Sequence, residues 1–179
     1  MKMTKKLTAL LLIFCALTAY AQRSEEEIIA EIYADMAANV GKMAPSFSLN
    51  NPKGELVTLE SLKGHWVILD FWGSWCRFCV ADIPKLKRFY EQYHPEGLEI
   101  IGIDCGETEE AWKAAIERYA IPWTNVYNPG KRNSGVCEEY AVRAYPSKIL
   151  IDPDGIIKNV YLDDDEELFE FLRLIYDQK

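Results

Sequence analysis

The side chains best suited to chemistry in this chain are two cysteines three positions apart, Cys76 and Cys79. They follow the apolar run Trp66 to Trp72, which is typical of a buried strand, and they open a segment with helical periodicity. Residues at i and i+3 of a helix lie on one face about 5–6 Å apart, which is close enough for a disulfide. The pair is therefore predicted to be a redox-active dithiol that opens and closes with little backbone movement.

The order of the two cysteines predicts their roles. Cys76, at the helix N-terminus and beside Arg77, should have a lowered pKa and act as the nucleophile, because free backbone N–H groups and a cation stabilise a thiolate. Cys79 should resolve the mixed disulfide that Cys76 forms with a substrate. Resolution needs a proton acceptor, and a carboxylate in a poorly hydrated site suits that role. Asp70, which follows apolar residues 67–69, is the candidate, with a solvated strand-end acid as the alternative.

Residues 1–21 have the pattern of a secretory signal peptide. Three lysines precede the apolar run Leu7 to Leu17, and Ala19-Tyr20-Ala21 is a small-x-small cleavage pattern. The run is shorter than the roughly 20 apolar residues that a membrane span needs. A lipoprotein signal with Cys15 as the mature N-terminus is the alternative, but Phe14 occupies a position that such signals give to a small residue. We therefore expect cleavage after residue 21 and an exported, periplasmic or similar, location.

Charge and cysteine content narrow the class of protein. The formal net charge is −8, and loss of the three signal-peptide lysines makes it −11. This acidity argues against nucleic acid and anionic membrane surfaces as partners. Four cysteines remain, an even number that is consistent with disulfides in an exported chain. A zinc site would need further ligands, but His65 stands at a strand start and His94 in a turn, both expected at the surface, so no metal and no other cofactor is expected.

The rest of the chain alternates strands and helices. Residues 22–40 are a helical lead-in that starts with a capping box of Ser24 and Glu27, and residues 41–179 form one domain. Pro84 should kink the helix that carries the cysteines. The expected elements are a hairpin of 46–49 and 55–59, strands at 66–72, 98–104 and 123–127, helices at 76–93, 108–119 and 135–142, a hairpin of 147–151 and 156–161, and a last helix after the acidic residues 163–167. This order predicts a three-layer α/β domain with a mixed sheet.

Four segments, in this order, resemble the thioredoxin superfamily and, within it, the TlpA/ResA-like exported thiol–disulfide oxidoreductases. They are Gly41 to Leu49, Asp70 to Cys79, the insertion from Glu107 to about Asn128, and Val142 to Ser147. A lone Cys-x-x-Cys is weak evidence, but here flanking tryptophans and two prolines accompany it in the family's order. The resemblance covers residues 41–176 and implies a thioredoxin-like α/β/α sandwich with an N-terminal hairpin and a central helix insertion.

The resemblance also implies how substrate is held. Pro146 matches the family's cis-proline, so the Tyr145–Pro146 bond is expected to be cis. The Tyr145 backbone would then pair with an extended substrate segment in the manner of a strand. Trp75, Arg77 and Phe78 are expected to complete the substrate-binding surface.

Two departures from the family leave questions open. TlpA/ResA-like members more often have asparagine at the position of Asp70 and use an acid on the first helix, where Asp82 stands in a place expected to be exposed. Either acid is thus a candidate proton acceptor. The Arg77-Phe78 pair between the cysteines lacks the proline that is common in the family, and a cation beside Cys76 favours a more oxidising protein.

Cys105 and Cys137 are a second pair of interest. Cys105 ends a predicted strand and Cys137 lies early in a predicted helix, so both fall near the sheet edge that carries the active site. One expectation is a second disulfide, either structural or redox-active. The other is two separate, semi-buried thiols.

The sequence thus predicts an exported thiol–disulfide oxidoreductase that reduces disulfides in other exported proteins through a mixed disulfide. A disulfide oxidase or isomerase and a non-catalytic binding module with the same fold are the alternatives. A peroxiredoxin is disfavoured, because Leu69 and Gly73 stand where proline and threonine would precede the reactive cysteine. Family resemblance implies a membrane-bound electron donor as a further partner.

Overall fold

The computed structural model describes residues 24–162 and 166–177. Its contacts divide the chain into two units, residues 1–31 and 32–179. The described part of the first unit is the opening of helix α2 (Glu25–Ala37), where the predicted capping box is confirmed. The Glu27 N–H donates to Ser24 Oγ at 3.1 Å, and the Ser24 N–H donates to the Glu27 carboxylate at 3.0 Å. The predicted signal peptide, residues 1–21, lies outside the described residues.

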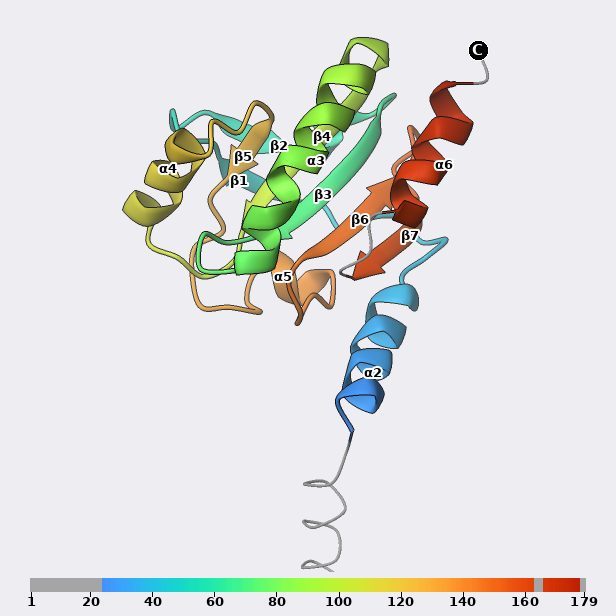
Figure 1. Ribbon diagram of the computed structural model, residues 1–179, viewed down its shortest axis with the longest axis horizontal. Coiled ribbons are helices and arrows are strands. Elements are labelled where there is room, and N and C mark those ends of the chain that lie inside the picture. Colours follow the sequence, from blue (N-terminus) through green and yellow to red (C-terminus); the bar gives the residue numbers. More distant parts are fainter. Residues whose placement is uncertain (1–23, 163–165, 178–179) are drawn as a thin grey trace, which may run out of the picture. The chain divides into compact units, whose positions relative to one another are not determined.

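The second unit is built on a five-stranded mixed sheet with the order β5-β4-β3-β6-β7 (Figure 1). The neighbours β3, β4 and β5 run parallel, whereas β6 is antiparallel to β3 and β7 is antiparallel to β6. Its strands are β3 (Trp66–Trp72), β4 (Leu98–Asp104), β5 (Thr124–Val126), β6 (Ser147–Ile151) and β7 (Ile157–Leu162). The inner strands β3 and β4 are almost wholly buried, which accounts for their nearly continuous apolar sequence.

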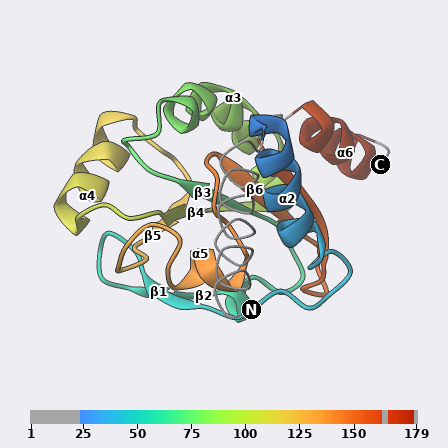
Figure 2. The same ribbon diagram turned by 90° about the horizontal axis from the view of Figure 1, so that it is seen from below.

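Helices and a small hairpin cover the two faces of this sheet. Figures 1 and 2 show α3 and α6 on one face, and α5 with the hairpin β1–β2 on the other. The covering elements are α3 (Arg77–Tyr93), α4 (Glu109–Arg118), α5 (Val136–Glu139), α6 (Glu166–Tyr176), β1 (Ser48–Asn50) and β2 (Leu56–Thr58). Helix α4 buries Trp112 in the same apolar cluster as α3 and α6. The three-layer α/β prediction with a mixed sheet is confirmed.

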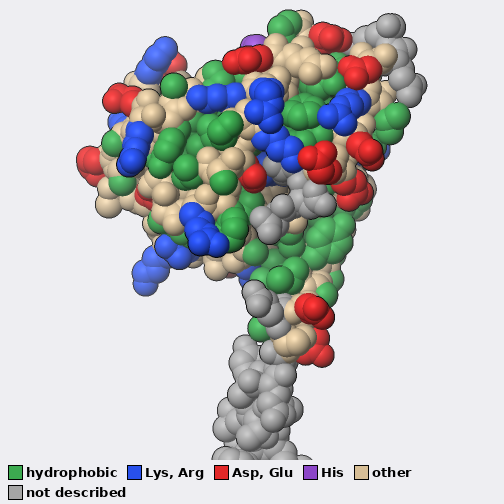
Figure 3. All heavy atoms as spheres, viewed as in Figure 1, with side chains coloured by type: hydrophobic (Ala, Val, Ile, Leu, Met, Phe, Trp, Pro, Cys, Tyr) green, Lys and Arg blue, Asp and Glu red, His purple; other side chains and the backbone are tan. Residues whose placement is uncertain are grey.

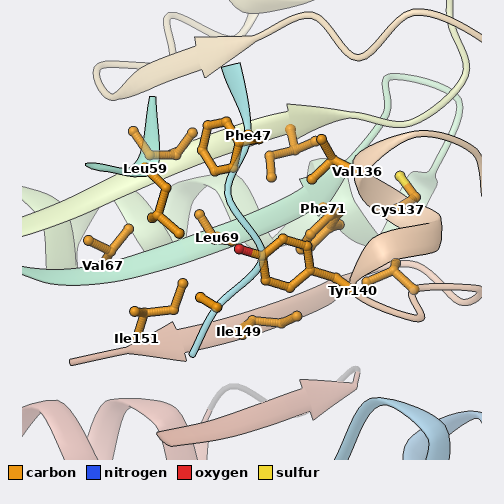
Figure 4. Packing of buried hydrophobic residues seen from close by; sticks show 14 of the residues in the cluster. Phe47, Leu59, Val67, Leu69, Phe71, Val136, Cys137, Tyr140, Ile149 and Ile151 are labelled. Atoms are coloured by element: carbon orange, nitrogen blue, oxygen red, sulfur yellow. The ribbon is translucent and has the colours of Figure 1, made fainter. Parts of the chain in front are cut away.

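Strand β3 divides its residues between two apolar clusters. Val67, Leu69 and Phe71 belong to the cluster under the hairpin and α5, which Figure 4 shows. Ile68 and Trp72 belong to the cluster under α3. Since successive strand residues point to opposite faces, position 70, which lies between Ile68 and Trp72, must also face α3. That position is an aspartate, and its placement matters for the chemistry below.

Some element boundaries differ from the expected ones. The first hairpin is shorter than predicted, and Thr58 caps a 3-10 turn over Leu59–Leu62 where a strand end was expected. Helix α3 begins at Arg77, one residue late, and runs through Pro84 to Tyr93 as one helix. The last helix begins at Glu166, and residues 163–165 lie outside the described part. Across the described ranges, no helix has both the length and the apolar character needed to cross a bilayer.

Candidate active site

The Cys-x-x-Cys cysteines form a disulfide at the start of α3. The S–S distance is 2.14 Å and the Cα atoms lie 5.3 Å apart, within the predicted spacing. Cys76 is the N-cap of α3, and its Sγ accepts the backbone N–H of Cys79 at 3.1 Å. Both side chains are nearly buried in this oxidised state, with exposed fractions of 6% and 4%. The same N–H and the helix dipole stabilise a Cys76 thiolate once the bond is reduced.

An aromatic wall adjoins the disulfide. The Trp75 and Tyr145 rings meet edge to face with their centroids 5.3 Å apart, and the Tyr145–Pro146 bond is cis, as the resemblance implied. The Trp75 indole N–H donates to the Cys105 carbonyl at 3.2 Å. A Cβ on Gly73 would lie 2.4 Å from the Trp75 indole nitrogen, so only glycine allows the ring to fold back in this way. Trp75 remains partly open to solvent and can meet a substrate.

Exposed apolar and cationic groups surround this wall. Phe78 is exposed on the first turn of α3, and the Arg77 guanidinium lies 4.5 Å from its ring centroid. A second cation, Arg132, lies 3.4 Å from a ring centroid of Trp75. Arg132 comes from a loop 57 positions away that no local sequence pattern connects to the cysteines. The rim therefore offers both aromatic surface and positive charge to a partner.

Two acids and one lysine lie on the α3 face of the sheet. Asp70 is 4% exposed, and its direct neighbour across the β3–β6 ladder is Lys148, at 1%. Direct cross-strand neighbours point to the same face, so both side chains face α3. From α3, Asp82 Oδ2 lies 3.2 Å from Lys148 Nζ and is only partly exposed. Asp70 is thus not a solvated strand-end acid, and the expectation that Asp82 is exposed was wrong, because a buried lysine holds it.

A family model described as the AhpC/TSA family matches residues 40–160. The chain belongs to this thioredoxin-fold family. It is 36% identical over 116 residues to the thiol-disulfide oxidoreductase ResA of Bacillus cereus, a match that covers 65% of this chain and 65% of that relative. It is 31% identical over 154 residues to the thiol-disulfide oxidoreductase ResA of Bacillus subtilis, covering 84% of this chain and 79% of the relative.

Solved structures agree with this AhpC/TSA assignment. The thioredoxin domain of a thiol-disulfide oxidoreductase from Bacteroides vulgatus matches with a TM-score of 0.70 and 32% identity, covering 76% of this chain and 96% of that one. A thiol-disulfide oxidoreductase from Bacteroides fragilis matches with a TM-score of 0.67 and 29% identity, covering 74% and 99%. The predicted resemblance and fold are confirmed.

Two acids that the sequence analysis did not single out lie at the end of β4 in this AhpC/TSA-family chain. Asp104, the ladder neighbour of Trp72, is fully buried. Burial raises the pKa of the Asp104 carboxyl to about 7, Glu107 adds to the rise, and the backbone N–H groups of residues 105–107 oppose it. The Glu107 carboxylate accepts hydrogen bonds from the Ser74 backbone N–H and hydroxyl, which ties the active-site loop to the β4–α4 turn.

The two remaining cysteines of the described chain are thiols in contact. Cys105 Sγ and Cys137 Sγ lie 3.3 Å apart, both fully buried and not bonded to each other. The expected second disulfide is not formed in this structure; the alternative of two free thiols holds, but the thiols are in contact and fully buried, not separate and semi-buried. No group of three or more His, Cys, Asp or Glu side chains suited to a metal ion occurs among residues 24–162 and 166–177.

Proposed function

We propose that this chain is an exported thiol–disulfide oxidoreductase that reduces disulfides in other exported proteins. The observation that carries the proposal is the Cys76–Cys79 disulfide at the N-terminus of α3. The aromatic wall of Trp75 and Tyr145 lies beside it. The relatives named above, which bear the name thiol-disulfide oxidoreductase, support this reaction class.

The first step starts from the reduced pair. The Cys76 thiolate attacks one sulfur of a substrate disulfide, so a Cys76–substrate S–S bond forms and the substrate S–S bond breaks. The second substrate sulfur leaves as a thiolate. The N–H of Cys79, which already points at Cys76 Sγ, stabilises the attacking thiolate before the step. This geometry supports the nucleophile role predicted for Cys76.

The second step needs a proton acceptor for Cys79. Its thiol gives up the proton and attacks Cys76 Sγ, which restores the intramolecular disulfide and releases the substrate as a second thiolate. Asp70 and Asp82 are the candidate acceptors: Asp82 pairs with the Lys148 ammonium, and Asp70 stands opposite Lys148 in the β3–β6 ladder. A carboxylate in a poorly hydrated site suits this role, and Asp70 is the more buried of the two.

The surface around the cysteines indicates the kind of substrate. Strand-like pairing with the Tyr145 backbone would hold an extended segment, and the exposed Trp75 and Phe78 rings would contact apolar residues in it. Arg77 and Arg132 favour acidic residues near the substrate disulfide. Figure 3 shows that basic, acidic and apolar side chains are mixed over the wider α3–α6 face, so this preference is local to the site. After each turnover, a membrane-bound electron donor would reduce the Cys76–Cys79 disulfide again.

An oxidase is the second candidate function, and one observation favours it. Stabilising the Cys76 thiolate through the helix N-terminus stabilises the reduced form, which makes the disulfide a stronger oxidant. Reduction and oxidation use the same two cysteines in opposite directions. Equilibration of the pair in a glutathione series gives its potential and separates the two directions.

Insulin reduction tests the proposal. Wild type is compared with the double variant Cys76→Ser/Cys79→Ser, in the presence of dithiothreitol as electron source. We expect wild type to precipitate the insulin B chain much faster than the double variant does. Equal rates for the two proteins would contradict the proposed reaction.

A further inference from the structure

The Cys105 and Cys137 thiols lie outside the proposed reaction and have a site of their own. Cys105 follows β4 and Cys137 lies on α5, at the edge of the apolar cluster that Figure 4 shows. Their sulfur atoms are 3.3 Å apart in a thiol–thiol hydrogen bond, and neither side chain is exposed. An S–S bond is about 2.05 Å long, so the sulfurs need to approach by only about 1.3 Å to form one.

The surroundings of the two sulfurs are unequal. Asn128 Nδ2 lies 3.5 Å from Cys137 Sγ and donates to it, whereas Cys105 Sγ lies 3.4 Å from the Ile103 carbonyl, which can only accept. Hydrogen bonds from Cys105, Tyr145 and Asn128 lower the pKa of Cys137. Burial first, and then its contact with Cys137, raise the pKa of Cys105. The hydrogen bond that Asn128 donates to Cys137 Sγ favours a thiolate there, so Cys137 is the better nucleophile of the two.

We propose that Cys105 and Cys137 are a second redox site, a buried dithiol that a small hydroperoxide converts to a disulfide, with Cys137 as the nucleophile. The Cys137 thiolate attacks one peroxide oxygen, so an S–O bond forms, the O–O bond breaks and hydroxide leaves. Cys105 then loses its proton and attacks the Cys137 sulfur; the S–S bond forms and a second hydroxide leaves. Two electrons pass from the thiols to the peroxide, and each hydroxide becomes water.

Burial selects the oxidant. Neither side chain has exposed surface, so a protein disulfide cannot reach the sulfurs, whereas hydrogen peroxide is small enough to enter through a brief local opening. The site also adjoins the substrate wall, because the Trp75 indole donates to the Cys105 carbonyl and stacks edge-on against Tyr145. Closing the second disulfide moves Cys105 and so reaches Trp75. The NMR signal of the Trp75 indole N–H, which belongs to the first site, therefore reports on the state of the second site.

Peptide mapping tests the proposal on the full chain. Trypsin places the five cysteines in five different peptides, with Cys105 in residues 89–113 and Cys137 in residues 133–143. The variant Cys76→Ser/Cys79→Ser, reduced and desalted, is treated with one equivalent of hydrogen peroxide, and wild type is treated in parallel. We expect a disulfide-linked pair of these two peptides in both proteins, and a shifted Trp75 indole N–H signal by NMR.

Single variants test the order of attack. In Cys105→Ser, peroxide should leave a sulfenic acid on Cys137 that dimedone traps at least about tenfold more than it traps Cys105 in Cys137→Ser. Three results would overturn the proposal. In the mapping experiment they are oxidation of Cys137 without linkage to Cys105, or two unmodified thiols in folded protein. In the trapping experiment it is equal trapping of the two cysteines in the two single variants. Because the active-site cysteines are replaced in the mapping variant, these results do not depend on the oxidoreductase function proposed above.

Discussion

The two cysteine pairs of this protein have the same atoms in opposite settings. Cys76 and Cys79 occupy the start of a 17-residue helix beside exposed aromatic and cationic side chains. Cys105 follows the end of β4 and Cys137 lies on the short helix α5, and neither side chain has exposed surface. The first pair can meet another protein, whereas the second can meet only a small molecule. Position in the fold, more than the thiol itself, decides which partner a cysteine pair can have.

The acids near the two pairs differ in the same way. On the α3 face, Asp82 pairs with the Lys148 ammonium, and Asp70 lies opposite Lys148 on the neighbouring strand. Beside Cys105, burial raises the pKa of Asp104 to about 7, and no ion pair of Asp104 occurs among the residues that the structure describes. A buried carboxylate is thus balanced by an ion pair at one site and by proton uptake at the other.

The largest expected difference is between two single variants, one in each cysteine pair. Cys76→Ser should lower insulin reduction by at least about 1,000-fold, because the nucleophile is lost. Cys137→Ser should change it less than about twofold, because that thiol does not touch the substrate protein. Equal losses of insulin reduction in the two variants would show that the two pairs do not have different roles in the reaction.

Removing the buried cation should cost stability. Lys148→Met removes the buried ammonium that pairs with Asp82 and stands opposite the buried Asp70, and it should lower the free energy of unfolding by about 3–5 kcal/mol in urea denaturation. The matched control is Lys158→Met, which breaks a partly exposed ion pair of 3.8 Å with Asp152 and should cost less than about 1 kcal/mol. Similar costs for the two variants would mean that the buried ion pair contributes no more than a surface one.

Asp104 should make stability depend on pH. Its pKa is about 7 in the folded chain and near 3.8 when unfolded, so the folded state binds the extra proton between these values. Stability therefore falls as pH rises from 4 to 7, by at most about 4 kcal/mol at 1.36 kcal/mol per pKa unit. Asp104→Asn should lack this loss, so its free energy of unfolding should rise relative to that of wild type as pH rises from 4 to 7.

The control for Asp104 is an exposed acid in the β6–β7 turn, Asp154. Asp154→Asn should change the free energy of unfolding by less than about 0.5 kcal/mol. The measurement is urea denaturation at several pH values for wild type and both variants. Parallel pH curves for wild type and Asp104→Asn would show that Asp104 is not the source of the pH dependence.

The smallest effect is expected at the rim. Arg132→Gln removes the cation over Trp75 and should raise KM about two- to fivefold for a disulfide peptide with acidic residues, in line with a cation–π and charge contribution of about 0.5–1 kcal/mol. The neighbouring exposed Lys131, changed to Gln, is the control and should leave KM near the wild-type value. An unchanged KM in Arg132→Gln would restrict the substrate surface to the first pair and its aromatic wall.

Local patterns predicted much of the fold and the first cysteine pair. The apolar runs at 66–72 and 98–104 identified the central strands because strands buried on both faces exclude polar residues. Cys76, Cys79 and Pro146 followed from motif order. The hairpin ends were shifted, because Thr58 can serve equally as a strand residue and as a cap.

What the sequence analysis missed depends on contacts between distant segments. Lys148 stands in an apolar strand, which was a signal that could have been read, but its partner Asp82 lies 66 positions away. Asp104 ends an apolar strand just as Asp70 does, so the same argument could have found it. Glu107 and Arg132 reach the active-site loop through turns whose packing no local periodicity encodes.

Trapping the mixed disulfide tests the central claim most directly. Cys79→Ala keeps the nucleophile and removes the resolving thiol, so a disulfide-bonded substrate such as insulin should stay covalently attached. The account predicts that the attached peptide is residues 64–77, which contains Cys76. Attachment through the Cys105 or Cys137 peptide, or no attachment beyond that of Cys76→Ser/Cys79→Ala, would contradict it.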